Sequence, residues 1–269
     1  MTEPAVKTVD RVARIMRVMA HDAPDGWKLA DISRETGFGK ATTHRLIGAL
    51  VDVGFLYQDD ASRRYRLGIN AARIGEAARQ QELAHRARPV LARLAAATED
   101  TVFASLREGS SAVCVARAVG PFPIRTLTLE EGDRRPLGVG AGSLALLAAL
   151  PDEAVERAIG RNAAWLADYP GFDAAVLRSL VARTRRDGYA LNEGRIVSGM
   201  AAVGVPVLDT EGRPLAALSL AAIAERVGGG RLPGLLADLR REAALLAAAL
   251  TGATAGDTVS CSREESPAP

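Results

Sequence analysis

The stretch from residue 29 to residue 56, LADISRETGFGKATTHRLIGALVDVGFL, limits most strongly what this chain can fold into. Apolar residues recur at three- and four-residue intervals on both sides of a Gly37-Phe38-Gly39 break. This spacing predicts two short amphipathic helices, 29–36 and 40–53, joined by a tight turn. Gly37 suits the left-handed backbone conformation that ends a helix before such a turn. Taken alone, the segment would also fit an ordinary helical hairpin with a polar outer face.

The second of these predicted helices is typical of a recognition helix. Its outer face opens with side chains that donate hydrogen bonds to phosphates and base edges, as the second helix of a helix-turn-helix must. We therefore predict DNA contacts from Lys40, Thr42, Thr43, His44 and Arg45.

A β-hairpin is predicted directly after the two helices. Residues 55–57 begin a strand-like run, residues 59–62 supply turn-forming side chains, and residues 63–67 alternate apolar with basic side chains. Arginines on such a wing suit the phosphates or the minor groove, so Arg63, Arg64 and Arg66 are predicted backbone contacts. With an amphipathic helix at 9–21, these elements predict a winged helix-turn-helix domain over residues 1–69.

Composition is consistent with this interpretation and sets its limits. The chain has 269 residues, of which 48% are hydrophobic and 25% charged, so it is long enough for two folded cores. The net charge is only +2, which excludes a generally basic nucleic-acid coat and requires a local basic patch.

Other classes of protein find little support. Cys114 and Cys261 lie far apart, so neither a disulfide framework nor a cysteine zinc site is predicted. No apolar run approaches the length of a bilayer, and the first residues lack the apolar core of a signal peptide. We expect a soluble cytoplasmic protein with no membrane partner, no metal and no cofactor.

A long helix-forming segment follows the wing. Residues 70–97 are rich in Ala, Arg, Glu and Gln, and Pro89 is expected to divide them into a linker helix, 70–88, and a second helix. A thin apolar stripe on the linker could pair with the same helix of a second chain, although a purely connecting helix is the alternative. The stripe consists of Ile74, Ala77, Ala78 and Leu83.

Residues 89–250 mix strands with helices. Period-two alternation predicts strands from 101 to about 131, with Leu127 and Leu129 among them, and a Gly-rich turn then leads into helices at 143–150, 152–160 and 173–187. Strands are expected at 189–198, around 203–207 and around 218–220, before a closing helix at 235–250. This order predicts an α+β domain with an antiparallel sheet, followed by a disordered tail, 251–269.

The glycines of Gly138-Val139-Gly140-Ala141-Gly142-Ser143 allow two interpretations. Glycines before a helix expose amide groups and the positive end of the helix dipole, which favours an anionic ligand. Close packing of the backbone at a strand-to-helix turn is the alternative. A Walker loop is excluded because no Gly-Lys-Ser/Thr follows, and a dinucleotide fingerprint is weak.

An enzyme is not predicted. The sequence around Ser143 resembles a loosened nucleophile elbow, but a hydrolase needs a base for the serine proton. His21, His44 and His85 are the only histidines, so residues 89–250 contain none. A Ser-His-Asp triad and a histidine-rich metal site are therefore not expected. In the strand at 215–222, Ala217, Ser219 and Ala221 share one face, which leaves room for a ligand or for a packed helix.

Several segments in order resemble the IclR family of transcriptional regulators, across about residues 8–250. They are GFGKATTHRLIGALVDVGFL, YRLG, GDRRPLGVGAGSLALLA, RRDGYALNEG and AAVGVPVLDTEGRPLAALSL. The resemblance implies a GAF-like second domain that binds a small organic effector. It also implies homodimers or dimers of dimers that bind a pseudo-palindromic operator in double-stranded DNA. The alternative is a ligand-independent DNA-binding dimer whose second domain only oligomerises.

The resemblance also implies a set of effector contacts. The family often has a carboxylate at the position of Asn192, Cys at Ala202 and Lys at Leu144, and some members have Ser at Ala221. With fewer polar groups here, we expect an effector with a larger apolar part, such as an aromatic or alkyl carboxylic acid. The expected contacts are Gly140, Ala141, Gly142, Asn192, Ala202, Ser219 and Ala221.

Overall fold

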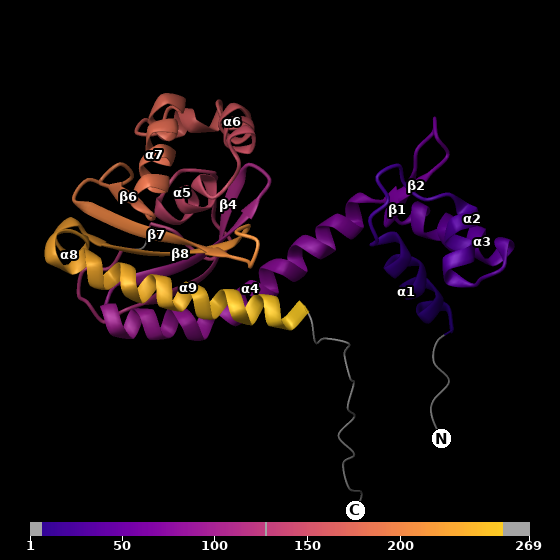
Figure 1. The fold of residues 1–269 in the computed structure, drawn as a ribbon, viewed down its shortest axis with the longest axis horizontal. Helices are drawn as coiled ribbons and strands as arrows, with labels where there is room; N and C mark the ends of the chain where they lie inside the picture. Colours follow the sequence, from indigo (N-terminus) through magenta and orange to yellow (C-terminus); the bar gives the residue numbers. More distant parts are fainter. Residues whose placement is uncertain (1–6, 127, 255–269) are drawn as a thin grey trace, which may run out of the picture. The chain divides into compact units, whose positions relative to one another are not determined.

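The computed structural model describes residues 7–126 and 128–254, and the chain divides between Arg79 and Gln80 into two compact units (Figure 1). The described part of the first unit contains helices and a two-stranded sheet. In chain order these are α1 (Lys7–Met19), α2 (Leu29–Thr36), α3 (Lys40–Asp52), β1 (Leu56–Gln58), β2 (Tyr65–Leu67) and the beginning of α4 (Ile69–Thr98).

The helix-turn-helix forms as the sequence predicts. Gly37 ends α2 with φ 70° and ψ 16°, the left-handed conformation, and its amide donates to the carbonyl of Arg34. Arg14 on α1 holds the turn, since its Nη2 lies 2.8 Å from the carbonyl oxygen of Thr36 and its guanidinium 4.9 Å from the ring centre of Phe38. One apolar cluster, which includes Ile15, Ile32, Ile47, Leu56 and Tyr65, joins the helices to the hairpin.

The predicted β-hairpin is confirmed. Leu56 pairs with Leu67 and Gln58 with Tyr65 in an antiparallel ladder. Trp27 adds a third segment, because its amide and carbonyl bond those of Tyr65 at 2.9 and 2.8 Å. The wing is therefore fixed to the loop that precedes α2.

Helix α4 corrects the prediction of a break at Pro89. It runs without interruption from Ile69 to Thr98, with the exposed Pro89 inside it. Proline removes one amide donor from a helix, which costs stability but does not by itself end the helix. Here Ala87, Val90 and Leu91 around the proline are buried in the core of the second unit, and this packing keeps the helix continuous.

The second unit is built on one antiparallel sheet, which confirms the predicted α+β class. The sheet has the strand order β5-β4-β3-β8-β7-β6. Its strands are β3 (Thr101–Glu108), β4 (Ser111–Val119), β5 (Arg134–Pro136), β6 (Ala190–Glu193), β7 (Met200–Leu208) and β8 (Pro214–Ile223). The helices besides α4 are α5 (Ala141–Ala148), α6 (Asp152–Arg161), α7 (Ala174–Asp187), α8 (Ala224–Val227) and α9 (Leu232–Thr254), with short 3-10 turns at Trp165–Asp168 and Gly229–Arg231.

Helices cover both faces of this sheet (Figure 1). On one face, Leu218 and Leu220 of β8 pack in a cluster with the second half of α4 and with α9. On the other face, α5 and α7 pack around Leu147 and Leu177. None of the helices in the described ranges is long and apolar enough to cross a membrane.

Two strands and the closing helix end at other residues than the sequence predicts. Strand β4 ends at Val119, and residues 128 and 129 are not in a strand, while residue 127 lies outside the described residues. The following loop instead bonds back to β4, where Gly132 and Asp133 exchange backbone hydrogen bonds with Cys114. The strand expected at 189–198 ends at Glu193, where a turn begins. Helix α9 extends to Thr254, and the rest of the tail predicted to be disordered lies outside the described residues.

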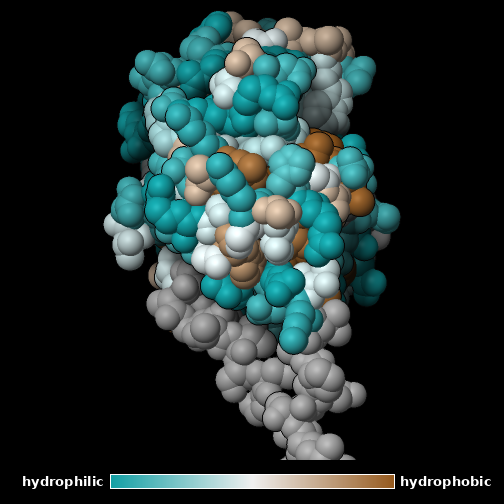
Figure 2. Space-filling view, turned by 90° about the vertical axis from the view of Figure 1, so that its right-hand side faces the viewer, coloured by the Kyte–Doolittle hydropathy of each residue, from teal (hydrophilic) through white to brown (hydrophobic). Residues whose placement is uncertain are grey.

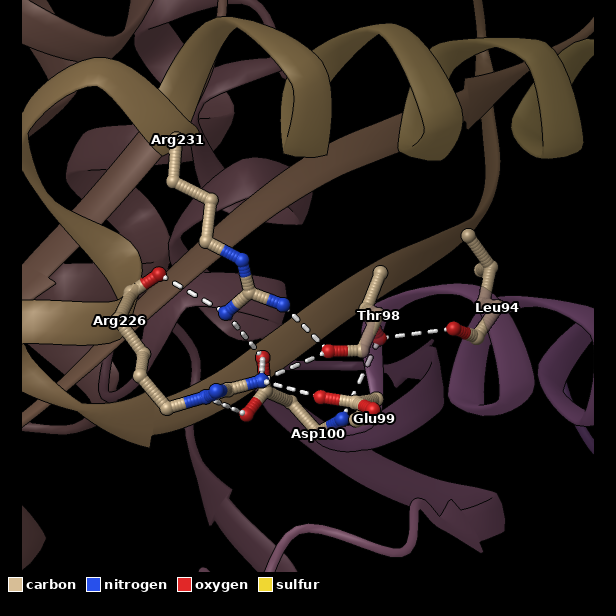
Figure 3. Close-up of polar contacts among 6 residues, drawn as sticks. All are labelled: Leu94, Thr98, Glu99, Asp100, Arg226 and Arg231. Carbon is tan, nitrogen blue, oxygen red and sulfur yellow. Dashed lines mark hydrogen bonds and ion pairs between the residues drawn. The ribbon is translucent and has the colours of Figure 1, made fainter.

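A buried aspartate joins the end of α4 to α8 (Figure 3). Asp100 is 3% exposed, and its two carboxylate oxygens lie 2.8 Å from Arg226 Nε and 2.7 Å from Arg231 Nη1. Both arginines also donate to the carbonyl of Thr98 in the last turn of α4, and the guanidinium of Arg226 lies 3.8 Å from the ring centre of Phe122. We call this group of five residues the Asp100 clasp.

Candidate DNA interface and effector cavity

The start of α3 is suited to an anionic partner. Gly39 precedes the helix without a side-chain cap, and the first turn contains no acidic residue. The first amides of a helix lack intrahelical acceptors, and together with the helix dipole they attract anions such as phosphate. Lys40, His44 and Arg45 are exposed on the same helix, and Thr42 is half-buried.

Thr43 does not lie on this outer face, so that part of the prediction is wrong. It is 0% exposed, and its hydroxyl donates to the carbonyl of Gly39 at 3.2 Å. The side chain lies on the same side of α3 as Leu46 and Ile47, three and four residues further along, which are also buried. Thr43 therefore stabilises the start of α3 from inside.

The wing arginines differ from one another. Arg64 Nη1 donates to the carbonyl of Gly26 at 2.8 Å, and Arg66 Nη1 donates to that of Pro24 at 3.0 Å, so both tie the wing to the loop before α2. Arg63 lies in the turn rather than on the returning strand, with φ 56° and an exposed side chain. The same turn is shaped by Asp59, whose pKa is lowered by the hydrogen bond from the Ser62 hydroxyl.

Exposed apolar side chains also gather in the first unit. Tyr57, Leu67 and Ile69 line one shallow depression and are 46%, 42% and 64% exposed. Ile74 on α4 is 57% exposed, whereas Leu83, predicted to share a stripe with it, is buried in the core of the second unit. The face drawn in Figure 2 is mostly hydrophilic, with small separate hydrophobic areas.

The second unit holds a cavity between the sheet and the start of α5. The cavity has a volume of about 60 Å³, measured with a sphere the size of a water molecule. On the same measure one water needs ~10–15 Å³, so the cavity has room for more than a single water. All seven residues expected to contact an effector line it: Gly140, Ala141, Gly142, Asn192, Ala202, Ser219 and Ala221. The structure therefore brings together residues from α5, β6, β7 and β8.

Alternation along β8 explains why the cavity lies on this face of the sheet. Ser219 and Ala221 line the cavity, while Leu218 and Leu220 project into the core on the opposite face. Small side chains leave the space, and Phe103 on the neighbouring strand β3 forms an apolar wall of it.

The glycine segment divides between its two interpretations. Gly138 has φ 105°, a backbone conformation that other residues rarely adopt, and a Cβ atom there would also press on the methyl groups of Leu177 and Leu147 at 2.7 and 2.9 Å. Gly140 and Gly142 instead line the cavity. Ser143 is structural as well as cavity-lining, because its hydroxyl accepts from the amide of Gly138 at 2.8 Å and donates to the carbonyl of Pro136 at 3.2 Å.

Sequence reasoning missed several polar groups of the cavity, and three of them bear on its chemistry. Arg135 on β5 lines it, and burial lowers the pKa of its guanidinium. The thiol of Cys114 lies in the wall, where burial, helped by the negative charge of Glu131, raises its pKa to about 12. Thr126 lines it from the loop after β4. The sequence did hold a signal for Arg135. Neighbouring residues of a strand point to opposite faces, so one of the two arginines in the strand Arg134–Pro136 had to face the cavity side of the sheet.

Metal binding finds no support in the described ranges, 7–126 and 128–254. No group of three or more His, Cys, Asp or Glu side chains there is arranged to hold an ion.

Comparison with known proteins decides the family. The model of the IclR helix-turn-helix domain matches residues 8–60, and that of the bacterial transcriptional regulator IclR C-terminal domain matches residues 75–247. The chain belongs to the IclR family. It is a DNA-binding transcriptional regulator, and the relatives of this IclR-family chain are named as regulators rather than as enzymes.

Both the relatives in sequence and the solved structures match this chain over most of its length. The HTH-type transcriptional regulator Rv1719 of Mycobacterium tuberculosis is 32% identical over 225 residues, which cover 83% of this chain and 85% of the relative. XynR of Escherichia coli is 28% identical over 250 residues, or 92% of this chain and 98% of the relative. An IclR-family regulator from Rhodococcus sp. superposes with a TM-score of 0.69 at 26% identity, covering 92% of this chain and 97% of the other.

A fourth relative was crystallised with a ligand. An IclR homologue from Microbacterium hydrocarbonoxydans, complexed with 4-hydroxybenzoate, shares the fold with a TM-score of 0.54. It is 23% identical over 91% of this chain and 99% of the other.

Proposed function

We propose that this IclR-family regulator binds a small carboxylic acid in the cavity of its second unit, and that this binding changes its affinity for an operator. The observation that carries the proposal is the cavity itself, since residues from four elements converge on a space that no described side chain fills. The complex of the Microbacterium homologue with 4-hydroxybenzoate supports an organic acid as the class of ligand.

The effector is expected to have a sizeable apolar part. Phe103, Ile196 and Val197 line the cavity, and Ala202 and Ala221 stand where other family members carry Cys or Ser. Apolar walls with a few polar groups are typical of sites for small organic ligands. An aromatic or alkyl acid suits these walls better than glyoxylate does.

DNA binding is assigned to the outer face of α3 and to the wing. Lys40, Thr42, His44 and Arg45 would contact the major groove, and the exposed Arg63 would contact phosphates. Arg64 and Arg66 keep a place in the interface, because the carbonyl that each binds leaves other guanidinium donors for phosphates.

A homodimer, or a dimer of dimers, would present two such heads to a pseudo-palindromic operator. The exposed apolar side chains support self-association, because burying them against a second copy would remove apolar area from water. They are Tyr57, Leu67 and Ile69 around one depression, and Ile74 further along α4. Helix α4, which begins in the first unit and ends in the second, would transmit the effect of the ligand.

The test begins with recovery of bound fragments from the genomic DNA of the source organism. Operator affinity is then measured by fluorescence anisotropy with and without aromatic, alkyl and glyoxylate-sized acids, and calorimetry measures each acid's affinity. We expect at least one larger acid to bind and to shift the operator affinity. Filling the cavity with Ala202→Leu should abolish the shift while operator binding remains. Acids that bind without any change in operator affinity would contradict the proposal.

A further inference from the structure

Arg135 brings a positive charge to the cavity wall without a direct ion pair in the described structure. Among the described residues that line the cavity, it is the only charged side chain, and no described carboxylate forms an ion pair with it. Its neighbour Arg134 points to the other side of β5 and pairs with Glu108. The two adjacent arginines therefore have different environments, and in the described structure only Arg134 forms an ion pair.

The guanidinium of Arg135 reaches the start of α5. Its Nη1 lies 3.6 Å from the position that a Cβ atom on Gly140 would take, and Ile196, beyond the opposite edge strand, lies 3.5 Å from the same point. Nη2 donates to the carbonyl of Thr128. The guanidinium has five donors, and the first amides of α5 add the positive end of a helix dipole at the same place. Burial lowers the pKa of Arg135, and this effect outweighs the opposing influence of nearby acidic groups such as Asp133.

Two further polar atoms in the cavity wall have no partner. Asn192 and Thr126 are 7% and 4% exposed, and neither Asn192 Oδ1 nor Thr126 Oγ1 has a hydrogen-bond partner in the described structure. Buried polar atoms are nearly always paired, so unpaired ones that face a cavity point to a ligand. Because Oδ1 only accepts hydrogen bonds, its missing partner is a donor.

These groups lie on different parts of the cavity wall. Arg135 is on β5 and Asn192 on β6, the two edge strands of the sheet. Phe103 of β3 lies on a strand between them and also lines the cavity. A ligand that satisfied both groups would carry an anion and a donor on an apolar body.

We propose that Arg135 determines the specificity of the cavity by binding the effector's carboxylate together with the first amides of α5, while Asn192 Oδ1 accepts a hydrogen bond from a hydroxyl on the same molecule. The effector class is then the hydroxycarboxylic acids. This assignment rests on the proposed function, because it assumes that the effector occupies this cavity.

Matched ligands test the assignment without changing the protein. The aromatic set is 4-hydroxybenzoate, benzoate and 4-hydroxybenzamide, and the aliphatic set is 3-hydroxybutyrate, butyrate and 3-hydroxybutanamide. Calorimetry on the full-length protein should show that at least one hydroxy acid binds about 10- to 100-fold more tightly than its amide, because an ionic hydrogen bond is lost. The same hydroxy acid should bind more tightly than the acid without the hydroxyl.

Variants then separate the two groups. Arg135→Met should remove the preference for the acid over the amide, and Arg135→Lys should restore part of it. Asn192→Leu should remove the preference for the hydroxyl and leave that for the carboxylate. The matched control is Arg134→Met on the same strand, which should change neither preference. Thermal melting of each variant establishes that it is folded.

The possible outcomes are distinct. The assignment is overturned if no hydroxy acid of either set binds, if the amides bind wild type as well as the acids do, or if folded Arg135→Met keeps its preference for the acid. Hydroxy acids that bind through Arg135 but leave operator affinity unchanged would contradict the proposed regulation and support the assignment of Arg135.

Discussion

The guanidinium of Arg45 is exposed on the outer face of α3, close to the uncapped start of that helix. If Arg45 reads a base edge, Arg45→Ala should weaken operator binding by about 1–3 kcal/mol. Fluorescence anisotropy at a fixed salt concentration measures the change. Arg157→Ala, which removes an exposed arginine from α6 in the second unit, should leave operator affinity unchanged. If both variants bind as wild type does, Arg45 does not belong to the interface.

The thiol of Cys114 should be unreactive in the folded protein. With its pKa raised to about 12 by burial, the thiolate fraction at pH 8 is on the order of 10⁻⁴. Iodoacetamide should therefore label Cys114 far more slowly in the native protein than in urea, as followed by peptide mass spectrometry. The unfolded thiol ionises near its ordinary pKa of 9.0, so this group should also lower the free energy of unfolding as pH rises above about 9. Equal labelling rates in the native and unfolded states would show that the thiol is not protected.

Residue types were easier to predict than residue environments. Helical spacing placed Lys40, His44 and Arg45 on the outside of α3, and the same spacing, applied to Leu46 and Ile47, would have placed Thr43 inside. The resemblance to the IclR family brought the cavity residues together by position. Which of the two adjacent arginines forms an ion pair could not be predicted, because it depends on the tertiary position of Glu108 on β3, which pairs with Arg134.

At the scale of elements, the Asp100 clasp should be a main source of stability in the second unit (Figure 3). Asp100→Ala leaves Arg226 and Arg231 without their buried partner, so we expect a loss of about 3–5 kcal/mol. Urea unfolding followed by the fluorescence of Trp165, in a Trp27→Phe background, reports on this unit alone.

The matched control for the clasp is Glu153→Ala, which removes a surface ion pair with Arg157 within α6. Pairs of this kind contribute about 0–1 kcal/mol. Similar losses for Asp100→Ala and Glu153→Ala would mean that the clasp adds no more than a surface contact.

Elements were predictable where local pattern and tertiary packing agree. The alternation in β8 and the apolar spacing in α3 each match the face that is buried. Pro89 is different, because a rule about local structure predicted a break and the burial of Val90 and Leu91 overrides it. Alternation around Leu129 likewise predicted a strand, but this loop lines the cavity instead and bonds to β4 through Gly132 and Asp133.

At the scale of the whole molecule, regulation requires the ligand to favour one arrangement of the DNA-binding heads over another. Helix α4 is continuous across the boundary between the units, and Ala77 and Ala78 are exposed on it next to that boundary. Glycine costs about 1 kcal/mol relative to alanine in a helix interior. The double variant Ala77→Gly/Ala78→Gly should therefore loosen α4 without touching the cavity or the DNA-binding face.

For this variant we expect ligand affinity like that of wild type and a ratio of operator affinities, with and without ligand, that moves towards one. Calorimetry measures the first quantity and anisotropy the second. The control pair Ala244→Gly/Ala248→Gly has the same cost in helix propensity, but both residues are exposed on α9, which lies within the second unit. It should leave the ratio unchanged. If the ratio of operator affinities is the same in this variant as in wild type, a stiff α4 does not transmit the effect of the ligand. Coupling through contacts between the protomers would then be the explanation.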